Sequence, residues 1–187
     1  MLTVTGCWNV FKATRIFHIV CAFVLFLRLC CFSPVFAFAD TEVERTEKIK
    51  IAYLFHFSQF TEWATKSSVF TYCVYDDTHF GQLLKQAYAG KMMSGLQISV
   101  QTVDAHANFD ECQLLYFPNT VPADLLATLR KKPILTVGEQ KNILDQGIIY
   151  LFEDNQKIRF FINNSQALLA GLKISSQLLT LSKEPQP

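Results

Sequence analysis

The feature that most limits how this chain can fold is its last long stretch, residues 148–181. Two β-rich runs, Ile148–Phe152 and Lys157–Ile162, flank a polar turn at residues 153–156. Two such runs around a polar segment of this length predict a β-hairpin with a longer loop.

The residues after this hairpin predict one helix that continues to Leu181. Asn163, Asn164 and Ser165 offer side chains that can accept hydrogen bonds from the first free N–H groups of a helix. Apolar residues then recur at steps of three and four, which indicates a helix packed on a core. The residues on this face are Leu168, Leu172, Ile174, Ser175, Leu178, Leu179 and Leu181.

A second apolar helix is predicted at the other end of the chain, over Glu42–Trp63, with Thr41 as its candidate N-cap. Acidic residues gather in its first turns, where the helix dipole favours negative charge. Two roles are open for the aromatic residues of this helix. They pack in the core, or some of them stay exposed and bind a partner protein. The apolar residues of this helix are Ile49, Ala52, Tyr53, Leu54, Phe55, Phe57 and Phe60.

Strands and helices alternate between these two ends. Strands separated by helices indicate a mostly parallel sheet with right-handed crossovers. We therefore predict an α/β fold, a three-layer sandwich with helices on both faces of the sheet, closed by an antiparallel β-hairpin at the sheet edge plus a C-terminal helix. The predicted strands are Val69–Tyr75, Leu96–Val103, Cys112–Phe117 and Pro133–Val137, and the predicted helices are Thr78–Tyr88 and Pro122–Leu129.

The first 39 residues have the pattern of a signal peptide for export. Lys12 and Arg15 precede an apolar core at residues 16–27, and the segment ends in Ala-x-Ala at residues 37–39. We predict cleavage there, one domain over residues 40–187 and a periplasmic location, with an uncleaved membrane anchor as the alternative. The remaining chain has no basic stripe, which argues against nucleic-acid binding.

No motif of a catalytic or cofactor site is present. The sequence contains no Gly-x-Gly-x-x-Gly, phosphate loop or Gly-x-Ser-x-Gly elbow, and His56 is expected to be structural. We therefore expect no catalytic residue, metal or cofactor. One polar group follows the carboxyl ends of two predicted strands, where α/β sheets tend to bind ligands. This group forms a ligand or metal site if the two loops converge. Otherwise Asp77 or Thr78 caps the next helix, and the other residues belong to solvated loops. Its members are Asp76, Asp77, His79, Asp104 and His106.

Two segments resemble the YfiR family of periplasmic proteins. The segment KIRFFINNSQALLAGLKISSQLLTL (residues 157–181) is similar to the family's C-terminal pattern, and KIKIAYLFHFSQFTEW (residues 48–63) is similar to its opening helix. The resemblance covers about residues 45–182. We favour a structural role over ligand binding for the polar members, and we keep partner binding open. The family-motif residues that we single out are Tyr53, Phe57, Phe60, Trp63, Arg159, Asn163, Lys173, Ser175 and Ser176.

Removal of the signal segment leaves two cysteines, Cys73 and Cys112. An even number in an exported chain suggests a disulfide. In a flavodoxin-like strand order, the strands that carry these residues are neighbours. The resemblance supports the same pairing, and two buried free thiols are the alternative.

The resemblance implies a regulator that acts by contact with other proteins. Family members repress an inner-membrane diguanylate cyclase by binding its periplasmic sensor region, which lowers cyclic-di-GMP and biofilm formation. The expected partners are this sensor region, an outer-membrane lipoprotein that sequesters the regulator, and a second copy of the chain. A small-molecule-sensing domain is the alternative, and an enzyme is the third hypothesis.

Overall fold

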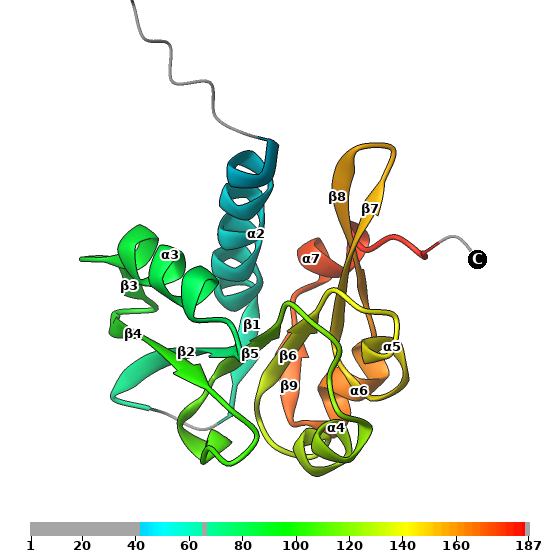
Figure 1. Ribbon diagram of the computed structural model, residues 1–187. Coiled ribbons are helices and arrows are strands. Elements are labelled where there is room, and N and C mark those ends of the chain that lie inside the picture. Colours follow the sequence, from blue (N-terminus) through cyan, green and yellow to red (C-terminus); the bar gives the residue numbers. More distant parts are fainter. Residues whose placement is uncertain (1–41, 65–66, 186–187) are drawn as a thin grey trace, which may run out of the picture. The chain divides into compact units, whose positions relative to one another are not determined.

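Seven strands form one mixed sheet in the order β3-β4-β2-β5-β6-β7-β8 (Figure 1). The computed structural model describes residues 42–64 and 67–185. The predicted signal peptide and the candidate cap Thr41 therefore lie outside the described residues. The strands are β2 (Val69–Tyr75), β3 (Met92–Met93), β4 (Leu96–Val103), β5 (Leu114–Phe117), β6 (Leu135–Gly138), β7 (Ile149–Asp154) and β8 (Lys157–Ile162).

The centre of the sheet is parallel. Strand β2 pairs in parallel with both β4 and β5, and β6 pairs in parallel with β5 and β7. The five strands β4-β2-β5-β6-β7 thus have the flavodoxin-like order 2-1-3-4-5, the order in which the two cysteine-bearing strands were expected to be neighbours. Only the two edge strands, β3 and β8, are antiparallel to their neighbours. Of the hairpin's two strands, β7 is therefore parallel to the rest of the sheet, and β3 is an edge strand that we did not predict.

Seven helical segments accompany the strands in the described residues. No helix among them is long and apolar enough to cross a membrane. Helix α3 has the predicted bounds, α4 begins directly after Pro122, and α5 was not predicted. The segments are α2 (Glu42–Gln59), α3 (Thr78–Tyr88), the 3-10 helix η1 (Phe109–Glu111), α4 (Ala123–Leu129), α5 (Ile143–Gln146), α6 (Asn164–Leu169) and α7 (Ser176–Thr180).

Alternate residues of the sheet belong to two different hydrophobic clusters. Tyr72 of β2 packs in one cluster with Leu54 of α2 and Leu178 of α7. Its neighbour Cys73 packs in the other cluster with Leu125 of α4. Side chains of successive strand residues point to opposite faces, so the two clusters are explained by the pleat. The mixed α/β fold is confirmed as a curled, mostly parallel sheet with helices, and the regular three-layer sandwich stays a prediction.

The loop of the β7–β8 hairpin is shorter than we predicted. Glu153 and Asp154 continue β7, and Asp154 pairs with Lys157. The turn therefore consists of Asn155 and Gln156, with φ values of 50° and 60°. Positive φ at both central residues is the mark of the tight turn that matches strand twist.

The prediction of a single C-terminal helix up to Leu181 was wrong. Helix α6 ends at Leu169, Gly171 has a φ of 73°, and residues Leu172–Ile174 form a short strand, β9. Glycine at positive φ ends helices cheaply because it has no Cβ. Leu172 and Ile174 are buried while Lys173 is exposed, which is the alternation of a strand. A second helix, α7, follows.

The opening helix is also shorter than predicted. It ends at Gln59, and Thr61–Trp63 form strand β1, which pairs with β9 in a separate two-stranded sheet. Leu54 and Phe57 are fully buried, whereas Ala52 is exposed and Ile49 is 40% exposed. The buried face of α2 is therefore narrower than its apolar sequence indicated.

Candidate functional site

The two segments that carry the family resemblance meet in space, first through an aromatic cluster. The ring of Phe57 lies 5.0 Å from that of Phe160 in β8, and Tyr53 lies 5.6 Å from Phe57 and 5.5 Å from Phe160. The Tyr53 hydroxyl also donates a hydrogen bond to the carbonyl oxygen of Ile158 over 3.2 Å. These contacts hold the second half of α2 against the hairpin.

The same two segments meet again in the β1–β9 sheet. Trp63 pairs with Leu172, and Glu62 pairs with Lys173. The Lys173 Nζ lies 3.6 Å from the Glu62 Oε2, with both side chains 77% exposed. An ion pair that is so exposed adds little to stability. The backbone pairing, and not the ion pair, therefore holds this junction.

Three polar motif residues sit at helix starts. The Asn163 side chain accepts a hydrogen bond from the N–H of Gln166 over 3.0 Å and caps α6, as predicted. The Ser175 side chain accepts from the N–H of Leu178 over 3.3 Å and caps α7. Ser176 is the exposed first residue of α7.

Two other motif residues keep a buried nitrogen without a hydrogen-bond partner in the described part of the chain. These are Nε1 of Trp63 and Nε of Arg159. The Trp63 ring packs edge-on against Phe70 at 5.1 Å, which gives it an apolar role. Nε of Arg159 forms no hydrogen bond within the described residues, so no bond at this atom ties the hairpin to another element.

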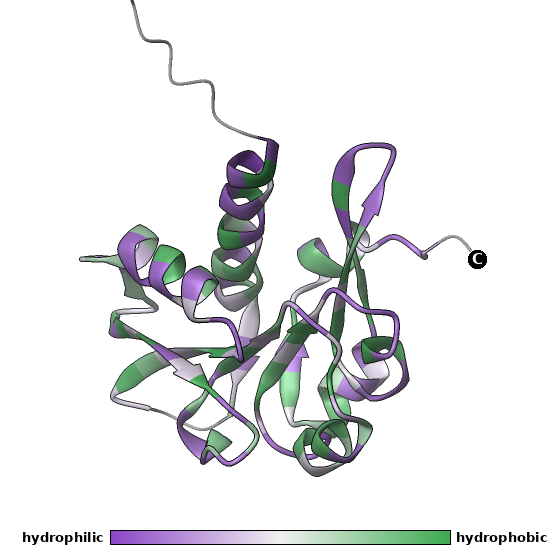
Figure 2. Ribbon diagram, in the orientation of Figure 1, coloured by the Kyte–Doolittle hydropathy of each residue, from purple (hydrophilic) through white to green (hydrophobic). Residues whose placement is uncertain are grey.

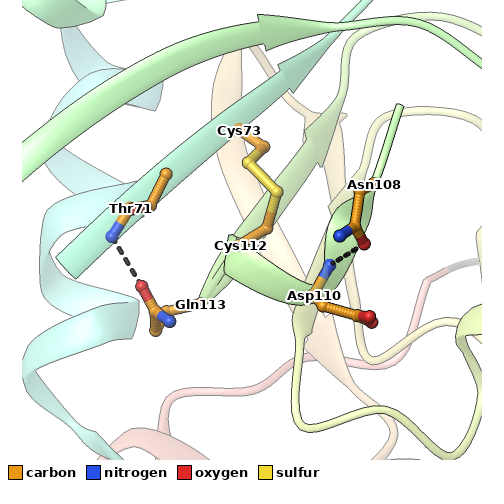
Figure 3. The surroundings of a disulfide bond; sticks show 6 residues. All are labelled: Thr71, Cys73, Asn108, Asp110, Cys112 and Gln113. Carbon is orange, nitrogen blue, oxygen red and sulfur yellow. Dashed lines mark hydrogen bonds between the residues drawn. A yellow bond between two sulfur atoms is a disulfide. The ribbon is translucent and has the colours of Figure 1, made fainter. Parts of the chain in front are cut away.

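The disulfide between Cys73 and Cys112 is confirmed, with Cα atoms 5.8 Å apart (Figure 3). We had predicted that Cys112 is the first residue of the third strand. It lies instead after η1 and just before β5. Beside the bond, the N–H of Thr71 donates to the Gln113 side chain over 2.6 Å. Cys73 is 0% exposed and Cys112 is 3% exposed, so a soluble thiol has no access to the bond.

The polar residues after β2 and β4 do not form a metal site. Asp77 accepts a hydrogen bond from the N–H of Phe80 over 2.9 Å and caps α3. Asp104 accepts from the N–H of His106 over 2.8 Å, and His79 faces Glu47 at 3.8 Å. In residues 42–64 and 67–185, no three His, Cys, Asp or Glu side chains gather as metal ligands. The predicted helix cap at Asp77 is confirmed.

Sequence reasoning missed a polar chain that links α2 to the sheet. The hydroxyl of Tyr116 in β5 donates a hydrogen bond to Oε1 of Glu139, and Oε2 of Glu139 lies 2.8 Å from Nζ of Lys50 in α2. Burial raises the pKa of Tyr116, and the negative charge of Glu139 raises it further. The available signal was a single acidic residue, Glu139, directly after a buried strand.

These observations define a class of protein. It is an α/β domain with a flavodoxin-like strand order, in which the opening helix and the C-terminal segment pack against each other. The model of the YfiR/HmsC-like family matches residues 47–183, and the chain belongs to this family. Proteins of this family are periplasmic regulators rather than enzymes. No curated protein matches the chain.

Proposed function

We propose that the protein is a periplasmic regulator that represses an inner-membrane diguanylate cyclase by binding the cyclase's periplasmic sensor region. The observation that carries this proposal is the family match over residues 47–183. The two segments that carry the family resemblance contact each other at Phe57–Phe160 and at Trp63–Leu172, so they lie together in the structure.

Repression follows from a difference in affinity. A regulator that binds the inactive state of the cyclase more tightly than the active state shifts the population toward the inactive state. A shift from 1:99 to 99:1 needs a difference of about 10⁴-fold in affinity. An outer-membrane lipoprotein that binds the same regulator would lower its free concentration and release the cyclase.

Two features support the proposed periplasmic location. Residues 1–39 have the pattern of an export signal, and Cys73 and Cys112 are bonded, as suits an oxidising compartment. Both features support a site of action in the periplasm.

Purification of the protein from its native envelope tests the proposal. A C-terminally tagged protein, expressed from its own promoter and cross-linked before lysis, should co-purify with a membrane diguanylate cyclase. The matched control is a chain that lacks residues 1–39, which stays in the cytoplasm and should capture none. Recovery of the exported protein without any cyclase would contradict the proposal.

A further inference from the structure

A groove runs between the first half of α2 and the β7–β8 hairpin, with a volume of about 520 Å³. Arg45, Ile49 and Tyr53 line it from α2, and Lys157, Ile158 and Arg159 line it from β8. Figure 2 shows hydrophilic residues on the first turns of α2 and at the tip of the hairpin. The volume suits a ligand the size of a single-ring compound, since small-molecule sites span roughly 300–1,000 Å³.

Three cationic side chains of the groove form no ion pair with any residue that the structure describes. Nε of Arg159 is buried and donates no hydrogen bond to any acceptor in the described residues. A buried donor of a charged group that stays unpaired costs free energy. The side chains of Arg45 and Lys157 also form no ion pair within residues 42–64 and 67–185. Lys50, which follows Arg45 and Ile49 in α2, is by contrast paired with Glu139.

The remaining lining residues limit the charge of a ligand. Glu42 and Glu153 also line the groove, so three cations face two carboxylates. The excess of one positive charge is balanced by a monoanion. Ile49, Ile158 and the ring of Tyr53 supply an apolar wall beside these charges.

We propose that this groove binds a small organic carboxylate with an apolar ring. The carboxylate lies against Arg159, whose guanidinium offers two parallel N–H groups to a carboxylate. Arg45 and Lys157 add positive charge at the rim, and the ring packs on Ile49 and Tyr53. This site is distinct from the strand-end loops at Asp76 and Asp104 that we had considered for a ligand. The proposal goes beyond repression of the cyclase and does not depend on it.

The test uses the exported protein, purified from the periplasm and titrated with benzoate, phenylacetate and the neutral analogue benzyl alcohol. A ligand that bridges α2 and the hairpin stabilises the folded state and raises the melting temperature. We expect benzoate or phenylacetate, at millimolar concentrations, to raise it saturably and to shift the NMR signals of Ile49 and Ile158. Benzyl alcohol should do neither. The absence of saturable binding by both carboxylates, or signal shifts only at Asp76 and Asp104, would overturn the proposal.

Variants locate the binding charge. Arg159→Gln removes the guanidinium and should weaken carboxylate binding about tenfold or more. Since Arg159 is partly buried and its variant can fail to fold, the exposed residues provide a second test: Arg45→Gln and Lys157→Gln should each weaken binding without unfolding. Lys131→Gln removes one exposed positive charge outside the groove and should leave the affinity unchanged. An equal loss in Lys131→Gln and Lys157→Gln would overturn the proposal.

Discussion

The backbone N–H of Ser175 donates a hydrogen bond to the carbonyl oxygen of Phe60 over 2.9 Å. This bond extends the pairing of β1 with β9 and joins the end of the opening helical segment to the start of α7. The two ends of the domain, more than a hundred residues apart in sequence, therefore depend on each other for their local structure.

The cap of α7 provides the first prediction. Ser175→Ala removes the side-chain oxygen that accepts from the N–H of Leu178. We expect the free energy of unfolding to fall by about 1 kcal/mol, the usual cost of losing a helix N-cap. Ser176→Ala is the matched control, because Ser176 is exposed and caps nothing. Chemical denaturation measures both, and equal effects of the two variants would contradict the assigned cap.

The aromatic contact between α2 and β8 provides a second prediction. Phe57 is 0% exposed and packs on Phe160, so Phe57→Ala leaves a cavity. The expected loss in the free energy of unfolding is about 3–5 kcal/mol. Ile49→Ala, at a position that is 40% exposed, should cost far less. A small effect of Phe57→Ala in denaturant titrations would show that α2 is not anchored at this contact.

The disulfide should stabilise the fold and should not act as a thiol switch, since both cysteines are buried. The bond closes a loop with a sequence separation of 39, for which the chain-entropy model gives about 4 kcal/mol. Cys73→Ser and Cys112→Ser should each destabilise by about 2–4 kcal/mol, and the double variant should be no worse than either one.

Thiol labelling of the exported, denatured protein checks the same bond directly. We expect no reactive thiol before reduction and two after it. Two reactive thiols in unreduced protein from an oxidising envelope would contradict the disulfide.

Alkaline pH should destabilise the protein through its buried tyrosines. Burial raises the pKa values of Tyr72, Tyr88 and Tyr116 well above the ordinary value of 10.0. Above that pH, the unfolded chain loses these phenolic protons while the folded chain keeps them. The unfolded state then binds fewer protons, so the free energy of unfolding falls as pH rises, by up to about 1.4 kcal/mol per pH unit for each tyrosine.

Tyr116→Phe isolates one of these groups. Denaturant titrations from about pH 9 to about pH 11 should give a shallower decline for the variant than for the wild type, by the contribution of one proton. The variant should also be less stable at neutral pH, because Glu139 loses the hydrogen bond from the Tyr116 hydroxyl. An identical pH slope in the two proteins would argue against a raised pKa at Tyr116.

Much of the central sheet was predictable from sequence because its strands are apolar runs or alternate apolar and polar residues. Val69–Tyr75 and Leu96–Val103 have the predicted bounds. The even number of cysteines and the expected strand order both favoured the Cys73–Cys112 bond, although Cys112 lies just before β5. The cap of α3 at Asp77 was also predictable, since its chemistry is local in sequence.

The two ends of the chain were harder to predict, because long-range pairing overrides a local periodicity there. Leu172, Ile174 and Leu178 fit a helical face, but Gly171 ends the helix and the backbone of residues 172–174 pairs with β1. Likewise, Trp63 continues the spacing of the opening helix and lies in a strand. The link from Lys50 through Glu139 to Tyr116 joins residues that are far apart in sequence, and its one local signal is the acidic residue directly after a buried strand.

The proposed repression of a diguanylate cyclase is tested most directly by the level of cyclic-di-GMP in the cell. The gene is deleted in its native host, restored on a plasmid, and cyclic-di-GMP is quantified by mass spectrometry in the wild-type, deleted and restored strains. We expect the level to rise on deletion and to return to that of the wild type on restoration. An unchanged level in the deleted strain, under conditions where the wild type makes and exports the protein, would contradict the proposed function.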